Sequence, residues 1–154
     1  MTSKAKGNLL VGIQFLLLGF LILLPEASDW ETPLVLIPVA NGMTLLAFTI
    51  LLISAINLGR SLTANPVPLE KAQLKTTGMY SIVRHPIYLA IVLLAIGRVA
   101  ISESILVLLA GASLVVLISI KARFEDQLLM KHYADYAAYA ARIGRMIPGV
   151  GRIR

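Results

Sequence analysis

Four apolar segments divide this chain, at about residues 9–24, 34–56, 87–101 and 105–120. The second segment is long enough to cross a hydrocarbon core about 30 Å thick, whereas the other three, at about 15–17 residues, are short for a span. A segment in lipid must satisfy its own backbone hydrogen bonds, which favours helices over isolated strands. The pattern therefore predicts an all-α integral membrane protein with about four transmembrane helices.

The first apolar segment follows Lys4 and Lys6, as the apolar part of a signal peptide would. It ends at Leu24-Pro25-Glu26, without the small residues that form a cleavage site. We therefore expect this segment to be retained as a span.

Composition supports the membrane assignment and limits the possible chemistry. Hydrophobic residues make up 58% of the 154 residues and charged residues only 14%, unlike a typical soluble protein. The length fits a single domain over residues 1–154. The net charge of +6 would suggest nucleic acid in a soluble chain, but here the basic residues flank apolar segments, so we expect no nucleic-acid partner. The absence of Cys excludes thiolate chemistry, and with only two His we expect no metal site.

The basic residues predict an orientation in the membrane. All Lys and Arg except Arg98 lie before the first segment, between the second and third, or after the fourth: Lys4, Lys6, Arg60, Lys71, Lys75, Arg84, Lys121, Arg123, Lys131, Arg142, Arg145, Arg152 and Arg154. The positive-inside rule then predicts a multi-pass protein with both termini and the central loop in the cytoplasm. The short chain suggests a prokaryotic plasma membrane. Arg98 lies inside the third segment, and we expect it to extend outward toward Glu103.

A polar stretch at residues 78–88, Gly-Met-Tyr-Ser-Ile-Val-Arg-His-Pro-Ile-Tyr, directly precedes the third segment. Pro86 fits the first turn of a helix, where its missing N–H has no cost. The third and fourth segments form a hairpin that returns the chain to the same surface. That topology is expected to bring polar residues from both ends of the hairpin together: Arg84, His85, Tyr88, Lys121, Glu125 and Asp126.

The segment at residues 121–143 is predicted to form a C-terminal cytoplasmic amphipathic helix. At helical spacing its apolar stripe contains Leu129, Tyr136, Ala140 and Ile143, with Glu125 on or beside it. A carboxylate on an apolar face is costly unless it is paired or bound. Simple structural interpretations remain open, because Lys121 and Glu125 could be an i,i+4 pair. The three Tyr at 133, 136 and 139 could anchor the chain at the membrane interface.

These residues resemble a known family. The pattern Leu74-x-x-x-Gly78-x-Tyr80-x-x-x-Arg84-His85-Pro86-x-Tyr88 resembles the cofactor-binding signature of the isoprenylcysteine carboxyl methyltransferase family, which includes phospholipid methyltransferase relatives. Glu125-Asp126 resembles its paired glutamates, and Tyr133-x-x-Tyr136-x-x-Tyr139 and Arg145-Met146-Ile147-Pro148 resemble its closing elements. The resemblance covers about residues 57–149. It implies an integral membrane methyltransferase that uses S-adenosylmethionine and releases S-adenosylhomocysteine.

The resemblance also implies positions for the site, in the regions of residues 57–88 and 121–149. The residues expected to bind the cofactor are Gln73, Leu74, Lys75, Tyr80, His85, Pro86, Ile87, Tyr88 and Glu125. Lys121 occupies a position where the family can carry a substrate-contacting arginine, and Arg123 could take over that role. We therefore expect both to bind the methyl acceptor, although lysine cannot grip a carboxylate in the bidentate way that arginine does.

The chemistry of the cofactor agrees with these residue types. A cationic group of S-adenosylmethionine could face Glu125, and its adenine could lie on Tyr80 or Tyr88. Its carboxylate could bind Arg84 or the backbone donors at the start of the third helix. An amine or hydroxyl acceptor would also need a base, for which His85 and Glu125 are suited. Arg84, His85 and Glu125 are therefore the predicted catalytic residues. The expected acceptor is lipophilic: an isoprenylcysteine-like carboxylate, a phospholipid or a small lipophilic molecule.

Two other functions fit parts of the sequence. Membrane sterol reductases look similar around the Arg-His-Pro-x-Tyr element but bind NADPH and are much longer. A small four-helix transporter would need an acid inside the membrane to couple protons, and the four apolar segments contain neither Asp nor Glu. The methyltransferase is the favoured prediction.

Overall fold

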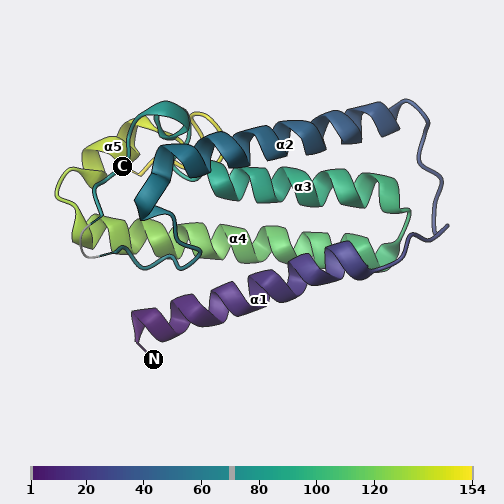
Figure 1. Cartoon of the computed structure of the whole chain (residues 1–154), viewed down its shortest axis with the longest axis horizontal. Helices are drawn as coiled ribbons and strands as arrows, with labels where there is room; N and C mark the ends of the chain where they lie inside the picture. Colours follow the sequence, from purple (N-terminus) through teal and green to yellow (C-terminus); the bar gives the residue numbers. More distant parts are fainter. Residues whose placement is uncertain (1, 70–71, 154) are drawn as a thin grey trace.

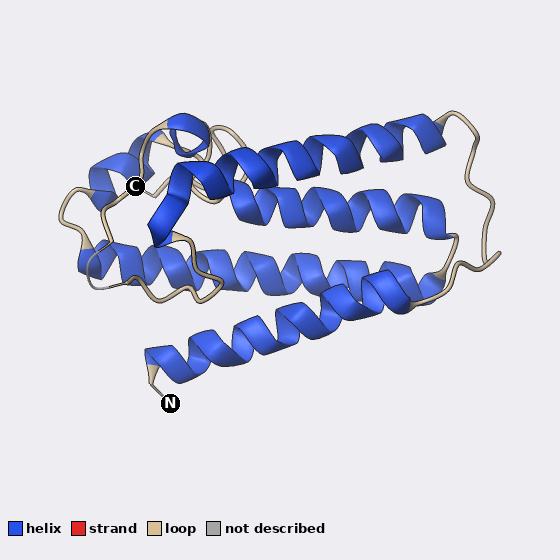
Figure 2. Cartoon of the chain, viewed as in Figure 1, coloured by secondary structure: helices blue, strands red, loops and turns tan. Residues whose placement is uncertain are grey.

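The computed structural model describes residues 2–69 and 72–153, so Lys71 and Arg154 of the basic pattern lie outside the described residues. Four long helices, α1 (Ser3–Leu23), α2 (Leu36–Leu58), α3 (Pro86–Ser102) and α4 (Ile105–His132), extend along the long axis of the molecule (Figure 1). Three short helices complete the described chain, η1 (Gly59–Ser61), η2 (Gly78–Ser81) and α5 (Tyr136–Arg142). Figure 2 shows helices joined by loops, and the described part contains no strand. The all-α prediction is confirmed.

Helix lengths differ from the expected spans. In the described residues, three helical segments are long and apolar enough to cross a membrane, Ser3–Leu23, Leu36–Ser61 and Ile105–His132, whereas α3 is a shorter apolar helix of 17 residues. The first and fourth segments are therefore longer than predicted. The polar residues flanking them continue the helix, and Thr2 Oγ1 caps α1 by accepting a hydrogen bond from Ala5 N at 3.2 Å.

Small residues allow α2 and α3 to pack closely. A Cβ atom added to Gly97 would lie 2.7 Å from Thr44 Oγ1 and 3.1 Å from the carbonyl oxygen of Ala40. Ala47 and Ala90 are fully buried in the same two helices. Close approach of backbones through small residues is the usual packing of membrane helices. In contrast to α2, helix α1 packs mainly against α4.

Arg98 closes the end of the bundle opposite the termini. Its Nε donates to the carbonyl oxygen of Leu21 at 3.1 Å and its Nη2 to that of Leu24 at 3.0 Å. Leu21 is in the last turn of α1 and Leu24 directly follows it, so neither carbonyl has a donor within the helix. The expected contact with Glu103 is wrong, because the ion pair of Arg98 is with Glu26, at 3.5 Å, and Glu103 accepts a hydrogen bond from another residue of the loop after α1.

Replacing Arg98 by methionine is expected to lower the free energy of unfolding by about 1–3 kcal/mol, because two carbonyls at the end of α1 lose their donors. Thermal unfolding in detergent measures this loss. Glu26→Gln is the control, since the Glu26 side chain is 71% exposed and its ion pair should contribute little. Equal stability of Arg98→Met and the wild type would contradict the capping role.

The other end of the bundle carries both termini and the connection between α2 and α3 (Figure 1). The prediction of a single helix over residues 121–143 is wrong, because α4 ends at His132 and Tyr133 adopts an extended conformation. After this break, α5 begins at Tyr136 in a new direction. Residues expected along one helical stripe instead form a cluster in which Tyr136, Tyr139 and Ala140 pack against Leu74, Leu129, Tyr133, Ile143 and Ile153.

Candidate functional site

Asp126, on α4, is the centre of a buried hydrogen-bond network. Its side chain lies beside the η2–α3 junction, α5 and the segment after α5, and the residue is only 2% exposed. It accepts hydrogen bonds from Arg84 Nη2 at 3.0 Å, His85 Nε2 at 2.9 Å, Arg145 Nε at 2.7 Å and the Tyr136 hydroxyl. A carboxylate can accept from this many donors only in its ionised form. Asp126 therefore joins segments that are far apart in the sequence.

Arg84 is fully engaged in the same network, and its side chain is completely buried. Besides Asp126, its guanidinium donates to the carbonyl oxygens of Ala140, Ile143 and Gly151. These bonds use all five N–H donors of an arginine. Arg84 could bind the carboxylate of a cofactor, as the sequence predicts, only by releasing one of these partners.

The backbone of Arg84 and His85 is also fixed. Arg84 N donates to the carbonyl oxygen of Gly144 and His85 N to that of Arg145, each at 2.9 Å. An isolated parallel bridge joins Val83 to Gly144 at the same place. The Arg-x-x-Pro segment that begins at Arg145 therefore holds the Arg-His-Pro segment in position.

Two tyrosines of α5 are buried donors in this region. Burial raises the pKa of Tyr136, and the charge of Asp126 together with its hydrogen bond raises this pKa further. Burial likewise raises the pKa of Tyr139 to about 12, and its hydroxyl donates to the carbonyl oxygen of Tyr80 at 2.5 Å. Interface anchoring is therefore the wrong interpretation for Tyr136 and Tyr139, which are 1% and 5% exposed.

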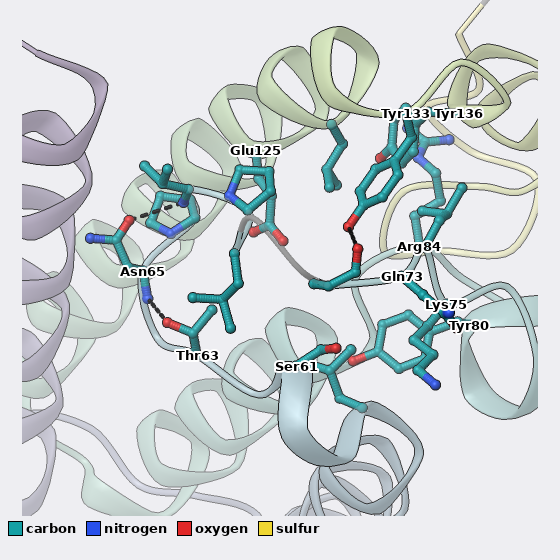
Figure 3. Close-up of a pocket in the computed structure, with 18 of the residues that line it drawn as sticks. Ser61, Thr63, Asn65, Gln73, Lys75, Tyr80, Arg84, Glu125, Tyr133 and Tyr136 are labelled. Carbon is teal, nitrogen blue, oxygen red and sulfur yellow. Dashed lines mark hydrogen bonds between the residues drawn. The ribbon is translucent and has the colours of Figure 1, made fainter.

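A cleft with about 640 Å³ of space, including its open mouth, lies beside this network. Figure 3 shows its lining side chains around an open space, with Glu125 and Tyr133 on one side and Ser61 and Tyr80 on the other. We call it the larger cleft. Its described lining residues are Leu58, Ser61, Thr63, Asn65, Pro66, Val67, Pro68, Leu69, Ala72, Gln73, Leu74, Lys75, Tyr80, Arg84, Glu125, Leu129, Tyr133, Tyr136 and Tyr139.

A second cleft, with about 370 Å³ of space including its open mouth, adjoins the larger one and shares five of its lining residues. It is lined by Leu58, Thr63, Tyr80, Arg84, His85, Ile87, Tyr88 and Glu125. Glu125 is the one carboxylate among the described lining residues of both clefts. Its Oε2 accepts a hydrogen bond from the Tyr88 hydroxyl at 2.5 Å and lies 3.9 Å from His85 Nδ1. A partly exposed negative charge therefore stands where the two clefts meet.

The structure brings most of the predicted cofactor-binding residues to these clefts. Gln73, Leu74, Lys75, Tyr80 and Glu125 line the larger cleft, and Tyr80, His85, Ile87, Tyr88 and Glu125 line the second. Pro86 is buried at the start of α3 and lines neither cleft. Neither predicted acceptor-binding residue lines a cleft, because Lys121 is buried against α1 and Arg123 is exposed elsewhere on α4.

Two features of the site were not named from the sequence. Residues 61–69 fall within the predicted region 57–88, but none of them was named as a site residue. They form much of the wall of the larger cleft, and Asn8 Oδ1 holds this segment by accepting from Asn65 Nδ2 at 2.7 Å. The only signal there was the Asn-Pro-Val-Pro sequence, which predicts extended chain. The central position of Asp126 was also missed. Consecutive residues of a helix point about 100° apart, so Glu125 can face the clefts while Asp126 faces the interior.

Comparison with known families decides the class of protein. A family model described as phospholipid methyltransferase matches residues 36–136. This chain belongs to the phospholipid methyltransferase family. The predicted membrane methyltransferase family is thereby confirmed, whereas separate comparisons with curated proteins and with solved structures found no match. In this member of the phospholipid methyltransferase family, the matched region contains Arg84, His85, Glu125 and Asp126. Helix α1 and Arg145 lie outside it.

Proposed function

We propose that this protein transfers a methyl group from S-adenosylmethionine to a lipophilic acceptor at the membrane. The single observation that carries the proposal is Glu125, a partly exposed carboxylate at the junction of two adjoining clefts. When bound, S-adenosylmethionine supplies a methyl group on a sulfonium, which becomes a neutral thioether as the methyl moves to the acceptor. A negative charge at the junction complements the cationic groups of this donor.

The residue types that line the larger cleft suit the chemistry of the donor. Tyr80 and Tyr133 provide aromatic walls for adenine. Lys75 and Gln73 supply hydrogen-bond donors for the carboxylate of S-adenosylmethionine. They suit this role better than Arg84, because the N–H groups of Arg84 are all engaged.

The second cleft is suited to the acceptor, because apolar Leu58 and Ile87 line it together with His85. The Asp126 carboxylate can only accept hydrogen bonds, so the proton between the two side chains is on His85 Nε2. In the neutral imidazole, Nδ1 can then accept a proton from the acceptor substrate. This arrangement suits a phospholipid amine, which must lose a proton when it is methylated. Acceptor contacts of Lys121 and Arg123 stay predictions.

The location of the site agrees with the predicted orientation. Both clefts lie at the end of the bundle that carries the termini and the basic connections. We propose that this end faces the cytoplasm, where S-adenosylmethionine is made, and that the acceptor arrives from the bilayer of a prokaryotic plasma membrane.

A transfer assay tests the proposed function. Purified protein is incubated with S-adenosylmethionine labelled in its methyl group and a total membrane lipid extract, and the lipids are then separated. We expect label in a lipid fraction with the wild type and much less with Glu125→Gln at the same concentration of S-adenosylmethionine. If the purified protein instead oxidised NADPH in the presence of the same extract and transferred no label, it would be a reductase.

A further inference from the structure

Lys121, on α4, is fully buried against α1 and lies near Tyr88, which lines the second cleft. Its ammonium donates to Gln14 Oε1 at 2.5 Å and lies 5.2 Å from the centre of the Tyr88 ring. Tyr88 in turn donates to Glu125. Lys121 is thus separated from the Glu125 carboxylate by a single aromatic side chain.

The expected partner of Lys121 is Glu125, because residues four apart on a helix are neighbours and opposite charges at this spacing attract. The structure shows no ion pair between these two described residues, and the side-chain nitrogen that lies near the Glu125 carboxylate is instead His85 Nδ1, at 3.9 Å. The Lys121 ammonium points to α1 rather than along its own helix. A group on α1 must therefore bind the Lys121 ammonium in preference to the Glu125 carboxylate.

Gln14 is that group. It is a polar side chain in an apolar helix and is only 5% exposed, a position that is costly unless the amide is hydrogen-bonded. It also lies on α1, outside the residues that match the family. Removing the amide would leave a buried ammonium without its hydrogen-bond acceptor, which is strongly destabilising. We therefore expect the ammonium to turn toward Glu125, the carboxylate four residues along its own helix.

We propose that Gln14 is a positioning residue that holds Lys121 away from Glu125 and so keeps this carboxylate free for a cationic methyl donor. The inference rests on the proposed function. Without Gln14, the Lys121 ammonium pairs with Glu125 and neutralises the charge at the junction of the clefts. Helix α1 then contributes to the selection of the cationic methyl donor as well as to anchoring in the membrane.

The test compares the affinities of two ligands for the purified protein. S-Adenosylmethionine and S-adenosylhomocysteine share their adenosine, ammonium and carboxylate groups, but only the former has a charged sulfur. In Gln14→Leu we expect the affinity for S-adenosylmethionine relative to S-adenosylhomocysteine to fall roughly fivefold. Adding Lys121→Met to this variant should restore the ratio. Gln14→Glu keeps an acceptor for Lys121 and should have a ratio at or above that of the wild type.

A purely structural role of Gln14 gives a different result. Loosened packing would weaken both ligands equally, so an unchanged ratio in Gln14→Leu, or a lowered ratio that Lys121→Met does not restore, would overturn the inference. Gln14→Ser, too short to reach Lys121, replaces the leucine variant if that one does not fold. Failure of the wild type to bind either ligand would overturn the proposed function itself.

Discussion

Replacing Asp126 by alanine is expected to lower the free energy of unfolding by about 3–5 kcal/mol, because it leaves a buried guanidinium without its counter-charge. The side chain of Arg84 is completely buried, and its charge is balanced by Asp126 at 3.0 Å. The same change removes the acceptor for His85, Tyr136 and Arg145. Chemical or thermal unfolding of the purified protein in detergent measures the loss.

Asp135→Ala is the matched control for this prediction. Asp135 is an exposed aspartate before α5 whose side chain makes no capping hydrogen bond. Its replacement should change the stability by less than about 0.5 kcal/mol. If Asp126→Ala were as stable as Asp135→Ala, the network around Asp126 would not hold the site together.

The second large effect is expected for Glu125→Gln, which should lower the affinity for S-adenosylmethionine at least tenfold, or about 1.4 kcal/mol. The change removes the negative charge at the junction of the clefts. The glutamine still offers an oxygen to the Tyr88 hydroxyl, and the side chain of Glu125 is 25% exposed, so the fold should remain intact. Equilibrium binding and thermal unfolding, measured on the same preparation, separate the two effects.

Glu31→Gln provides the control for the charge itself. Glu31 is exposed and lies in the loop between α1 and α2, at the opposite end of the bundle. We expect wild-type affinity in this variant. Wild-type affinity in Glu125→Gln as well would mean that this carboxylate does not face a cationic group of the ligand.

Much of the fold could be predicted, because the surroundings of each part of the chain, lipid or water, determine where apolar segments and basic residues occur. All four predicted spans are helices, and their hairpin does bring His85 near Glu125. Helix ends were harder to predict, since hydropathy marks where lipid ends and not where hydrogen bonding along the backbone ends. Helix α4 accordingly continues to His132, well beyond its apolar part.

Details of the site depended on geometry that periodicity does not contain. The break at Tyr133 turns α5 back, and only then can Tyr136 reach Asp126. Similarly, the contact between Gln14 and Lys121 depends on how α1 crosses α4. The sequence named Glu125 as the acid of the candidate site, but it did not indicate that the adjacent Asp126 joins the surrounding segments through buried hydrogen bonds.

Equilibrium binding of S-adenosylmethionine to the purified wild-type protein tests the central claim most directly. We expect saturable binding at one site per chain, competed by S-adenosylhomocysteine and unaffected by NADPH. Absence of saturable binding of either S-adenosyl compound, or competition by NADPH, would contradict a methyl-donor site at Glu125.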